Sequence, residues 1–384
     1  MRLFFWIGVG WLLYVYAGYP IVLWIVSWFR RVRPVIGDAL PTVTVLISAR
    51  NEERDIEWKV RQTLQWEYPA EKLQILVASD ASEDRTDELL QSIHDPRFSF
   101  VRMPERVGKN SALNRLVRLA TGELLFFTDA NSDIDAGCLR RIVRYFCDGR
   151  VGCVTGVEEN TSDKEATALS TAGGTYLNYE SSINKLEGNL GSVLVCDGSI
   201  FCMRRSLYSE LRPELANDLE LPLRVGRTGA WILFEPSARS REHTTLCARE
   251  EFSRRKRICG QGILAMWALR SQLTGFRAWQ FFSRKFLRWF SLVPLVMIFV
   301  ASVALRSDRG FAGLLALQFV FFALALMGWL MMRQGNKPGR LIALPFYFLL
   351  VNIAAVKGIA EALSGRRFAV WDIAHLSRGR QGAA

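Results

Sequence analysis

The sequence predicts an α/β domain with a mostly parallel sheet, inserted between transmembrane helices. Three observations support this prediction. Residues 3–29 contain no charge over 27 positions, apolar β-rich runs alternate with amphipathic patterns over residues 42–157, and long apolar runs return after residue 287. Alternation of strand and helix patterns is typical of a parallel sheet with both faces covered. A chain of 384 residues has room for about two or three such units.

The first apolar run predicts a transmembrane anchor over residues 1–33. A bilayer core needs about 20 apolar residues in a helix, and residues 3–29 exceed that length. The run is too long for the core of a signal peptide and lacks a small-residue cleavage site. Arg30, Arg31 and Arg33 follow it directly, and basic flanks favour the cytoplasmic side. We therefore expect a multi-pass protein of the inner cell membrane whose middle domain is cytoplasmic.

The C-terminal region, residues 287–384, is expected to contain about three transmembrane helices, over residues 287–305, 311–332 and 341–363. Asn352, Lys357 and Glu361 favour a partly buried or interfacial position for the last of them. Four crossings would place the basic tail outside, so either one segment does not cross or the tail breaks the positive-inside rule. Residues 263–290 mix aromatic and basic residues, which favours helices in the membrane interface over an amphipathic helix packed on the domain.

Five strands are expected in the middle domain, with ligand-binding residues directly after them. The strands are predicted at residues 42–48, 74–80, 98–103, 123–130 and 152–157, and the helices between them at 52–66, 84–93, 109–120 and 135–147. Ligands of open α/β sheets bind beyond the carboxyl ends of the strands. The segments that follow three of these strands are residues 49–52, 80–82 and 129–131.

Charge and composition exclude several classes of protein. The net charge is +12, yet residues 34–245 hold 25 Lys+Arg and 32 Asp+Glu, so the bases lie beside the apolar segments and no nucleic-acid partner is expected. Neither a GxGxxG turn nor a GxxxxGK[ST] loop is present, which argues against dinucleotide-binding Rossmann folds and P-loop NTPases. Three histidines leave little for a multi-histidine zinc site. Seven cysteines without a CxxC pair indicate scattered thiols in a reducing compartment.

Seven motifs in order give the middle domain a specific resemblance. They are ISARNEE (47–53), VASDASEDRT (77–86), RVGKNSALNRL (106–116), FFTDAN (126–131), CDGSIFCMRRSLY (196–208), NDLELPLRVGRTG (217–229) and EEFSRRKRICGQG (250–262). Together they resemble the membrane-bound family-2 glycosyltransferases, the branch that includes cellulose and hyaluronan synthase-like enzymes. The resemblance covers residues 42–262. It implies a GT-A type nucleotide-diphospho-sugar transferase domain over residues 34–262, between transmembrane helices.

The resemblance implies a set of donor-binding residues. In the family, the position of Asp80 contacts the imide of uracil, and Glu52 lies near the nucleoside. Helix capping by Asp80 and a first-turn acid at Glu52 are the structural alternatives. Lys109 follows a glycine at a helix start, which suits an anionic diphosphate, and its alternative is a solvated lysine. The full set of nucleotide-sugar-binding residues is Ala49, Arg50, Glu52, Asp80, Lys109, Asp129 and Arg257, with Arg50 in place of the family's usual aromatic residue.

Asp129-Ala130-Asn131 stands where the family has its DxD metal motif. The resemblance implies Mg²⁺ or Mn²⁺ held by Asp129 and Asn131, because hard divalent ions prefer oxygen ligands. Asn131 replaces the second acid, so we expect metal dependence with weaker affinity. Asp133 and His243 are candidate helpers. The structural alternative is that Asp129 only caps the following turn.

Asp218 stands where inverting members place the general base, after Asn217 instead of an acid. A carboxylate there can remove the proton of an acceptor hydroxyl. Its alternative is a helix N-cap, and both roles are compatible. Asp197, Gly198 and Arg254 are the implied acceptor residues, although Asp197 and Gly198 could also form a simple turn.

Residues 254–258 match the family's Q-x-x-R-W only at Arg257. Arg254 replaces the glutamine and Ile258 replaces the tryptophan, which weakens the case for a long stacked polymer. Arg255 and Lys256 are expected to form a basic patch attracted to anionic lipid.

The resemblance therefore implies an inverting membrane glycosyltransferase. It would move a sugar from a nucleotide sugar, expected to be UDP-linked, to a growing polysaccharide or a lipid-linked acceptor at the cytoplasmic membrane face. Homo-oligomers or other synthase subunits are candidate partners, because four spans are few for a secretion pore. The alternative is a degenerate, non-catalytic nucleotide-sugar-binding membrane scaffold, which the departures at Arg50, Asn131 and Ile258 motivate.

Overall fold

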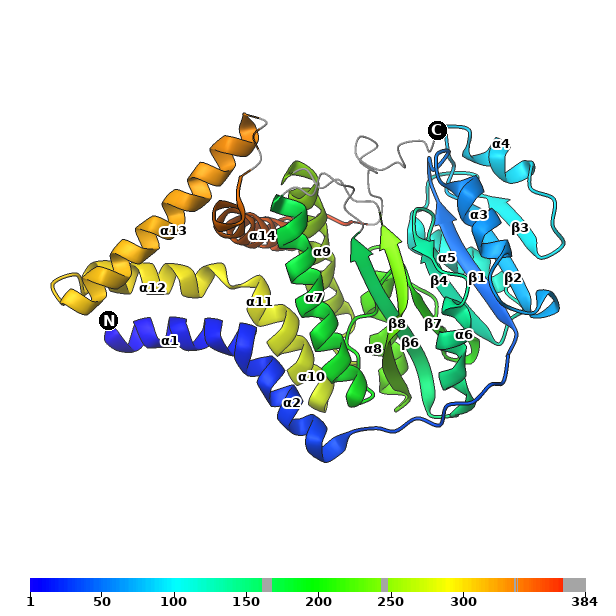
Figure 1. Cartoon of the computed structure of the whole chain (residues 1–384), viewed down its shortest axis with the longest axis horizontal. Coiled ribbons are helices and arrows are strands. Elements are labelled where there is room, and N and C mark those ends of the chain that lie inside the picture. The colour runs from blue at the N-terminus through cyan, green and yellow to red at the C-terminus, as the bar shows by residue number, and fades with distance from the viewer. Residues whose placement is uncertain (161–167, 243–247, 335, 337, 369–384) are drawn as a thin grey trace.

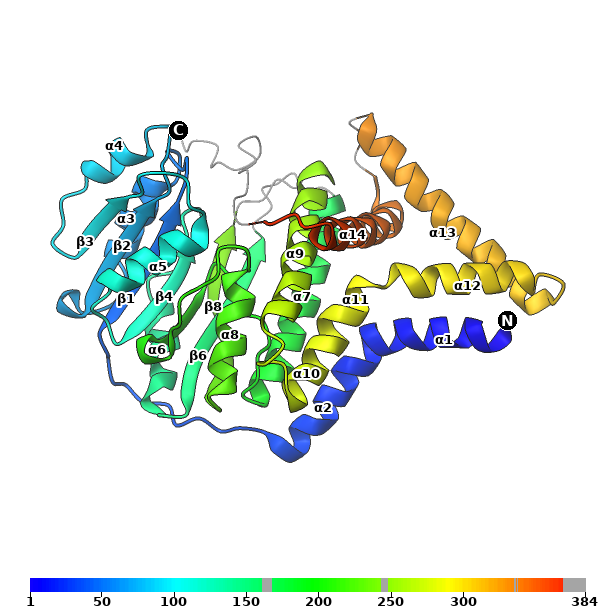
Figure 2. The same cartoon turned by 180° about the vertical axis from the view of Figure 1, so that it is seen from behind.

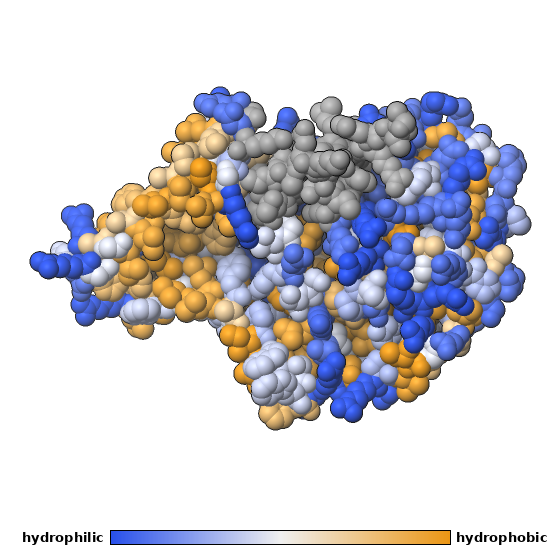
Figure 3. Space-filling view, in the orientation of Figure 1, coloured by the Kyte–Doolittle hydropathy of each residue, from blue (hydrophilic) through white to orange (hydrophobic). Residues whose placement is uncertain are grey.

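The computed structural model describes residues 1–160, 168–242, 248–334, 336 and 338–368. One half of the molecule is an α/β domain, and the other half is a group of long helices (Figure 1). The space-filling view shows apolar residues gathered over the long helices and polar residues over the α/β domain (Figure 3). This division agrees with the charge distribution along the sequence.

The α/β domain is built on one eight-stranded sheet in the order β3-β2-β1-β4-β7-β6-β8-β5. Parallel pairing joins β3 to β2, β2 to β1, β1 to β4, and β6 to β8. The strands are β1 (Val43–Ala49), β2 (Leu73–Ser79), β3 (Phe98–Arg102), β4 (Leu124–Asp129), β5 (Asp133–Ile134), β6 (Val151–Asn160), β7 (Phe201–Arg204) and β8 (Trp231–Glu242).

The five expected strands are confirmed as β1, β2, β3, β4 and β6, and the sheet is mixed. Pairing is antiparallel between β4 and β7, β6 and β7, and β5 and β8. The short strand β7 lies between β4 and β6 in the sheet, although it comes after both of them in the sequence. No local pattern in the sequence predicts this position. The helices and 3₁₀ turns of this domain are α3 (Ile56–Leu64), η2 (Ala70–Lys72), α4 (Thr86–Gln91), α5 (Lys109–Leu119), α6 (Cys138–Val143), η3 (Arg144–Cys147), η4 (Arg205–Leu207) and α8 (Asn217–Arg227).

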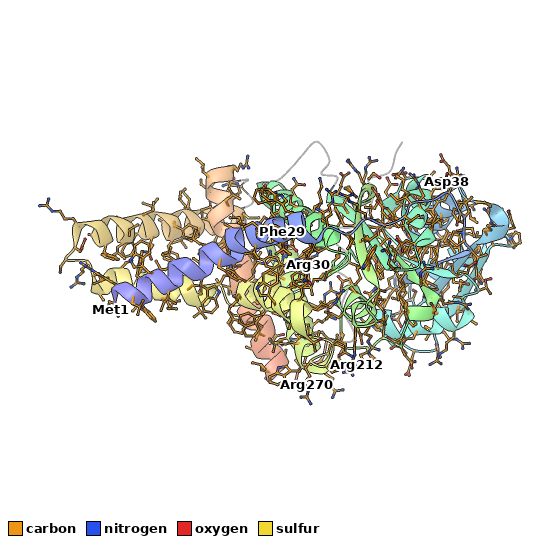
Figure 4. All side chains as sticks on the ribbon, turned by 90° about the horizontal axis from the view of Figure 1, so that it is seen from below. Met1, Phe29, Arg30, Asp38, Arg212 and Arg270 are labelled. Carbon is orange, nitrogen blue, oxygen red and sulfur yellow. The ribbon has the colours of Figure 1, made fainter. Side chains whose placement is uncertain are left out.

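Within the described residues, three helices are long and apolar enough to cross a membrane. The first joins α1 (Arg2–Leu13), a π-helical turn η1 (Tyr14–Gly18) and α2 (Tyr19–Arg30), and the others are α13 (Arg309–Arg333) and α14 (Arg340–Leu363). Helix α1 lies beside α12 (Leu292–Ala304) in both cartoon views (Figure 2). Figure 4 shows the N-terminal helix running from Met1 to Arg30, after which the chain crosses to Asp38 on the α/β domain.

The predicted span over residues 287–305 contains a bend. The chain forms α10 (Gly275–Phe281), the π-helical turn η5 (Phe282–Phe286) and α11 (Leu287–Trp289), and then bends by 56° into α12. Pro294 lies in the first turn of α12, where the missing N–H of proline costs no helical hydrogen bond. Helix α12 has 13 residues and is about 20 Å long, which is shorter than a bilayer core.

Helix α14 packs against the domain as well as against α13. Half of its apolar segment is buried, mainly against α9 (Ala248–Ala268), with further contacts to α13 and to α7 (Ala168–Asn189). A side chain at Gly358 would overlap the backbone of α9, so glycine permits the close approach of the two helices. Lys256 pairs with Glu361 at 3.1 Å, and Arg255 pairs with Glu251 at 2.7 Å. The expected lipid-facing patch of Arg255 and Lys256 is therefore wrong, because both cations turn into protein.

Glu187 on α7 ties the N-terminal helix to the domain. Its fully buried carboxylate accepts hydrogen bonds from the Tyr19 hydroxyl and the Arg284 guanidinium at 2.5 Å each, and from the Leu194 amide at 2.9 Å. These partners come from the N-terminal helix, from η5 and from the loop that leads to the site. One carboxylate thus orients three segments that are distant in sequence.

Replacing Glu187 with alanine is expected to lower stability by about 3–5 kcal/mol, because the change leaves the buried Arg284 with less compensation for its charge. The thermal midpoint of the purified protein in detergent checks this. Glu210→Ala is the matched control, since the Glu210 side chain is 65% exposed and pairs only at the surface. Equal midpoints for the two variants would contradict the role of Glu187.

Candidate active site

A cavity of about 890 Å³ opens at the carboxyl ends of β1, β2 and β4. It is lined by nearly every site residue that the sequence predicted. The predicted residues that line it are Arg50, Glu52, Asp80, Lys109, Asp129, Asn131, Asp197, Gly198, Asp218, Arg254 and Arg257. Ala49 is not among the lining residues; its side chain is buried and its carbonyl accepts the Asp80 amide at 2.8 Å.

The loops after β1 and β2 are joined into one wall. The Arg50 guanidinium donates to the carbonyls of Asp80 at 2.7 Å and Ala81 at 2.5 Å. The Asn51 side chain accepts the Glu83 amide at 2.8 Å. Asn51 and Ala81 both have positive φ, near 50°, which is costly for a residue with a Cβ. The strain is tolerated because the two loops hold one another in place. The Arg50 side chain contributes to this by its hydrogen bonds to the loop after β2.

Asp80 connects this wall to the start of α5. Its carboxylate accepts the backbone amides of Val107 at 2.7 Å and Gly108 at 3.0 Å. Gly108 has φ of 84°, the left-handed region that favours glycine, and α5 begins at the next residue. The capping alternative for Asp80 is wrong, because Arg85 is the N-cap of α4.

Lys109 points across the cavity to Asp129. Its Nζ lies 2.5 Å from the Asp129 carboxylate, and both side chains are half-buried. The solvated-lysine alternative is therefore wrong. The pair brings the first turn of α5 to the end of β4, where a cation and a carboxylate face the same space.

The residues at the end of β4 include two side chains of the type that binds divalent ions. Asp129 and Asn131 supply two oxygen donors, and Mg²⁺ is commonly bound by one or two carboxylates plus substrate phosphates. No group of three acidic, histidine or cysteine side chains suited to a metal occurs among the described residues. Asp133 accepts a 2.5 Å hydrogen bond from Gln62, and His243 lies outside the described residues. The donor set therefore leaves coordination positions for the phosphates.

Lys59, which the sequence did not single out, stabilises the turn after β4. Its fully buried Nζ donates to the Ser132 carbonyl at 2.7 Å, and burial lowers its pKa to about 7. Lys59 lies on α3, in an amphipathic pattern that reads as a surface helix. Its role depends on the packing of α3 under the turn after β4.

Asp218 lines the cavity beside Gly198. It lies in the first turn of α8, whose N-cap is Ala216, so the N-cap alternative is wrong. A Cβ at Gly198 would lie 3.7 Å from its Oδ2, so glycine keeps the space beside the carboxylate open. Burial raises the pKa of Asp218, while the charges of Lys109, Lys285 and other cations oppose that rise. A carboxylate with a raised pKa is suited to accept a proton.

Asp197 organises the loop opposite Asp218. Its carboxylate accepts the Ser199 amide at 3.0 Å, the Ser199 hydroxyl at 2.6 Å and the Glu158 amide at 2.9 Å. Burial raises the pKa of Asp197 to about 6. These bonds form the turn that presents Gly198, as the simple-turn alternative predicts, and both residues line the cavity.

Glu158 is a site residue that the sequence analysis passed over. Its carboxylate lies 3.5 Å from Arg254, and burial raises its pKa to about 7. Its Oε1 has no hydrogen-bond partner among the described residues. Glu158 lies near the end of β6, so the strand-end rule applied to the fifth predicted strand would have found it. Arg254 therefore supports Glu158 in the cavity.

With Asp218 as the general base, activity is expected to rise with pH through the acidic range and then to level off. Burial raises the pKa of Asp218 above its usual value, so this carboxyl group stays protonated to a higher pH than an ordinary aspartate, and in that form it cannot act as a base. A profile of kcat/KM between about pH 5 and pH 8 tests this. The opposite slope would contradict a carboxylate base.

Comparison with known proteins shows which family the domain resembles. Residues 44–212 match the family model Glycosyl transferase family 2. The chain is 26% identical over 308 residues to "Probable glycosyltransferase YdaM" of Bacillus subtilis, covering 74% of this chain and 72% of that protein. It is 30% identical to the beta-monoglucosyldiacylglycerol synthase of Synechocystis over 31% of this chain and 26% of that one.

A solved structure shares the fold over nearly the whole chain. The mannosyltransferase PcManGT from Pyrobaculum calidifontis, in complex with GDP-Man and Mn²⁺, has a TM-score of 0.69 at 20% identity, covering 92% of this chain and 99% of that one. Residues 44–212 of the present protein therefore resemble the family-2 glycosyltransferases, and the chain shares its fold with this mannosyltransferase.

Proposed function

We propose that the protein is an inverting transferase that takes a sugar from a UDP-linked donor and passes it to a hydroxyl of a glycan or lipid-linked acceptor. The observation that carries this proposal is the position of Asp218. A carboxylate with a raised pKa shares one cavity with Asp80 and with the Asp129–Asn131 turn. A proton acceptor, a nucleoside wall and a metal turn are the parts that sugar transfer needs.

Different residues would bind different parts of the nucleotide-sugar donor. Asp80 and Glu52 would face the base and nucleoside, with Arg50 positioning their wall. Lys109 and Arg257 supply positive charge for the diphosphate. Asp129 and Asn131 would hold Mg²⁺ or Mn²⁺, which when bound offsets the negative charge of the leaving diphosphate. The Mn²⁺ and GDP-Man in the structure of PcManGT support this assignment.

The chemistry at Asp218 is a single displacement. The acceptor hydroxyl gives its proton to the Asp218 carboxylate as its oxygen attacks the anomeric carbon. The bond to the diphosphate breaks on the opposite side, so the configuration of that carbon inverts. Lys109, close to Asp129, is placed to meet the developing charge on the phosphate side.

We infer a multi-pass position in the inner membrane with the domain in the cytoplasm. Arg30, Arg31 and Arg33 follow the first span and favour the cytoplasmic side. Helices α12 and α13 would enter and return, while α14, half-buried against α9 and α7, would lie along the membrane surface. The basic C-terminal tail then stays inside, which removes the conflict with the positive-inside rule. In this arrangement α14, one of the candidate spans, does not cross the membrane.

A donor panel on the purified protein in lipid tests the proposal. UDP-linked and GDP-linked sugars are supplied with Mg²⁺ or Mn²⁺, and free nucleoside diphosphate is measured together with the mass of any product. Steady release from a UDP-sugar supports the transferase. Binding without release would favour the alternative that Asn131 motivates, a nucleotide-sugar-binding scaffold.

A further inference from the structure

Glu158 lies beside the loop that faces the proposed base. It is near the carboxyl end of β6, and β6 and β8 lie between β4 and α9 in both cartoon views (Figure 1, Figure 2). Its backbone amide donates to the Asp197 carboxylate at 2.9 Å, and the next residue, Gly198, keeps the space beside Asp218 open. This hydrogen bond holds Glu158 next to the part of the cavity in which transfer would take place.

The strand pairing also brings Glu158 near the turn proposed to hold the metal. In the register of the sheet, Glu158 pairs with Ser240 of β8, and Ser240 pairs with Ile134 of β5. Residues 129–131 lead directly into β5. Two strand spacings, about 10 Å, therefore separate the backbone of Glu158 from that of Ile134. Because the anomeric carbon of a bound donor has to lie between residues 129–131 and Asp218, the sugar ring lies within reach of the Glu158 side chain.

The protein satisfies only part of the Glu158 carboxylate. The side chain is 10% exposed, Oε2 lies 3.5 Å from Arg254, and the buried Oε1 has no hydrogen-bond partner among the described residues. A buried carboxylate oxygen that lacks a partner costs free energy. The last torsion of a glutamate side chain is broad and two-fold, so either oxygen can turn toward the cavity that Glu158 lines. A hydrogen-bond donor on a bound sugar would supply the missing partner.

The neighbouring Glu159 has a different environment. Successive side chains of a strand point to opposite faces of the sheet. Glu159 is not among the residues that line the cavity, its side chain is 35% exposed, and it pairs with Arg239 at 2.9 Å and with Arg241 at 3.8 Å. Of two adjacent glutamates, one is thus paired with arginines away from the cavity, and the other brings an unpaired oxygen to the cavity wall.

We propose that Glu158 is a specificity-determining residue that accepts a hydrogen bond from a hydroxyl of the transferred sugar. The proposal rests on the transferase function above and identifies one contact of its donor. An ionised carboxylate accepts hydrogen bonds and donates none, so the sugar has to present a hydroxyl at this position. A sugar that lacks this hydroxyl leaves the buried carboxylate unpaired, and sites of this kind discriminate strongly against such analogues. The contact acts on the sugar and leaves the nucleotide unaffected.

The test measures ligand binding to the full chain in lipid nanodiscs, by calorimetry with Mn²⁺ present. The ligands are the nucleotide sugar that the donor panel selects, its monodeoxy analogues and the free nucleoside diphosphate. Glu158→Leu removes both carboxylate oxygens at similar volume, whereas Glu158→Gln keeps one acceptor oxygen without the charge. Glu159→Gln is the matched control, because it makes the same change at the adjacent position, away from the cavity.

In the native protein, one monodeoxy analogue is expected to bind about 10- to 100-fold more weakly than the parent sugar nucleotide. Glu158→Leu should abolish this difference by weakening the parent to the level of the analogue. Glu158→Gln should keep part of it, because a neutral acceptor forms a weaker hydrogen bond than a charged one. The affinity for free nucleoside diphosphate should stay the same in both variants, and Glu159→Gln should behave as the native protein.

The proposal is overturned if the native protein binds every monodeoxy analogue as tightly as the parent, a result that does not depend on any variant. It is also overturned if Glu158→Leu keeps the native ratio between parent and analogue, because a merely structural role would weaken both equally. Equal losses for the nucleotide sugar and for free nucleoside diphosphate would assign Glu158 to the nucleotide instead. A panel in which no nucleotide sugar is turned over would overturn the transferase function, on which the proposal rests.

Discussion

Asp218→Asn is expected to lower the rate of sugar transfer by about 10²- to 10⁴-fold, the range that one general base contributes. Asparagine has nearly the same shape but cannot accept the proton of the acceptor hydroxyl. The backbone carbonyl of residue 218, which accepts the Cys196 amide at 2.9 Å, is untouched by the change. The fold and the affinity for the donor should therefore be preserved.

The measurement combines single-turnover transfer with donor binding by calorimetry. Asp38→Asn is the matched control, because its side chain is 99% exposed. Transfer at the native rate by Asp218→Asn would remove Asp218 from the catalytic role. A parallel loss of donor affinity would instead make it a donor-binding residue.

Asp129→Asn is expected to lower transfer by about 10²- to 10³-fold and to weaken the affinity for Mn²⁺. The change removes the formal charge of the turn after β4 and deprives Lys109 of the carboxylate that lies 2.5 Å from it. Metal affinity is measured directly by titration of Mn²⁺ in the presence of the nucleoside diphosphate, so the effect is separate from the rate.

Asn131→Asp is the second variant, and it tests the same metal site by adding a charge instead of removing one. It restores a second carboxylate beside Asp129, and the affinity for Mn²⁺ should increase because a charged oxygen ligand replaces a neutral one. Unchanged affinity in both variants would show that the ion is not held by this turn. Opposite changes in the two variants would locate the ion between residues 129 and 131.

Local patterns were enough for the parallel half of the sheet and for the donor side of the site. Each of β1, β2 and β4 is a short apolar run, and a parallel sheet brings their carboxyl ends to one edge. Arg50, Asp80 and Asp129 could therefore be found by their position after a strand. Asp218 needed the motif resemblance, since its helix begins far along the chain from those strands.

The roles of residues that depend on tertiary packing could not be predicted from the sequence. Lys59 is buried only because α3 lies under the turn after β4. Lys256 looks like a lipid-facing cation in the sequence, yet Glu361, 105 positions away, neutralises it. The 56° bend between α11 and α12 was also not predicted, because composition records that a segment is apolar and not that it bends.

The sequence by itself determined the class of the protein, the division between an acidic domain and apolar segments, and the order of the donor motifs. The class follows from the resemblance of the seven motifs to a known family, and the division follows from charge and hydropathy along the chain. Only the tertiary structure decided that the cavity passes from Asp218 to the wall formed by α13 and α14. That continuity depends on helices distant in the chain whose contacts are set by burial and paired charge.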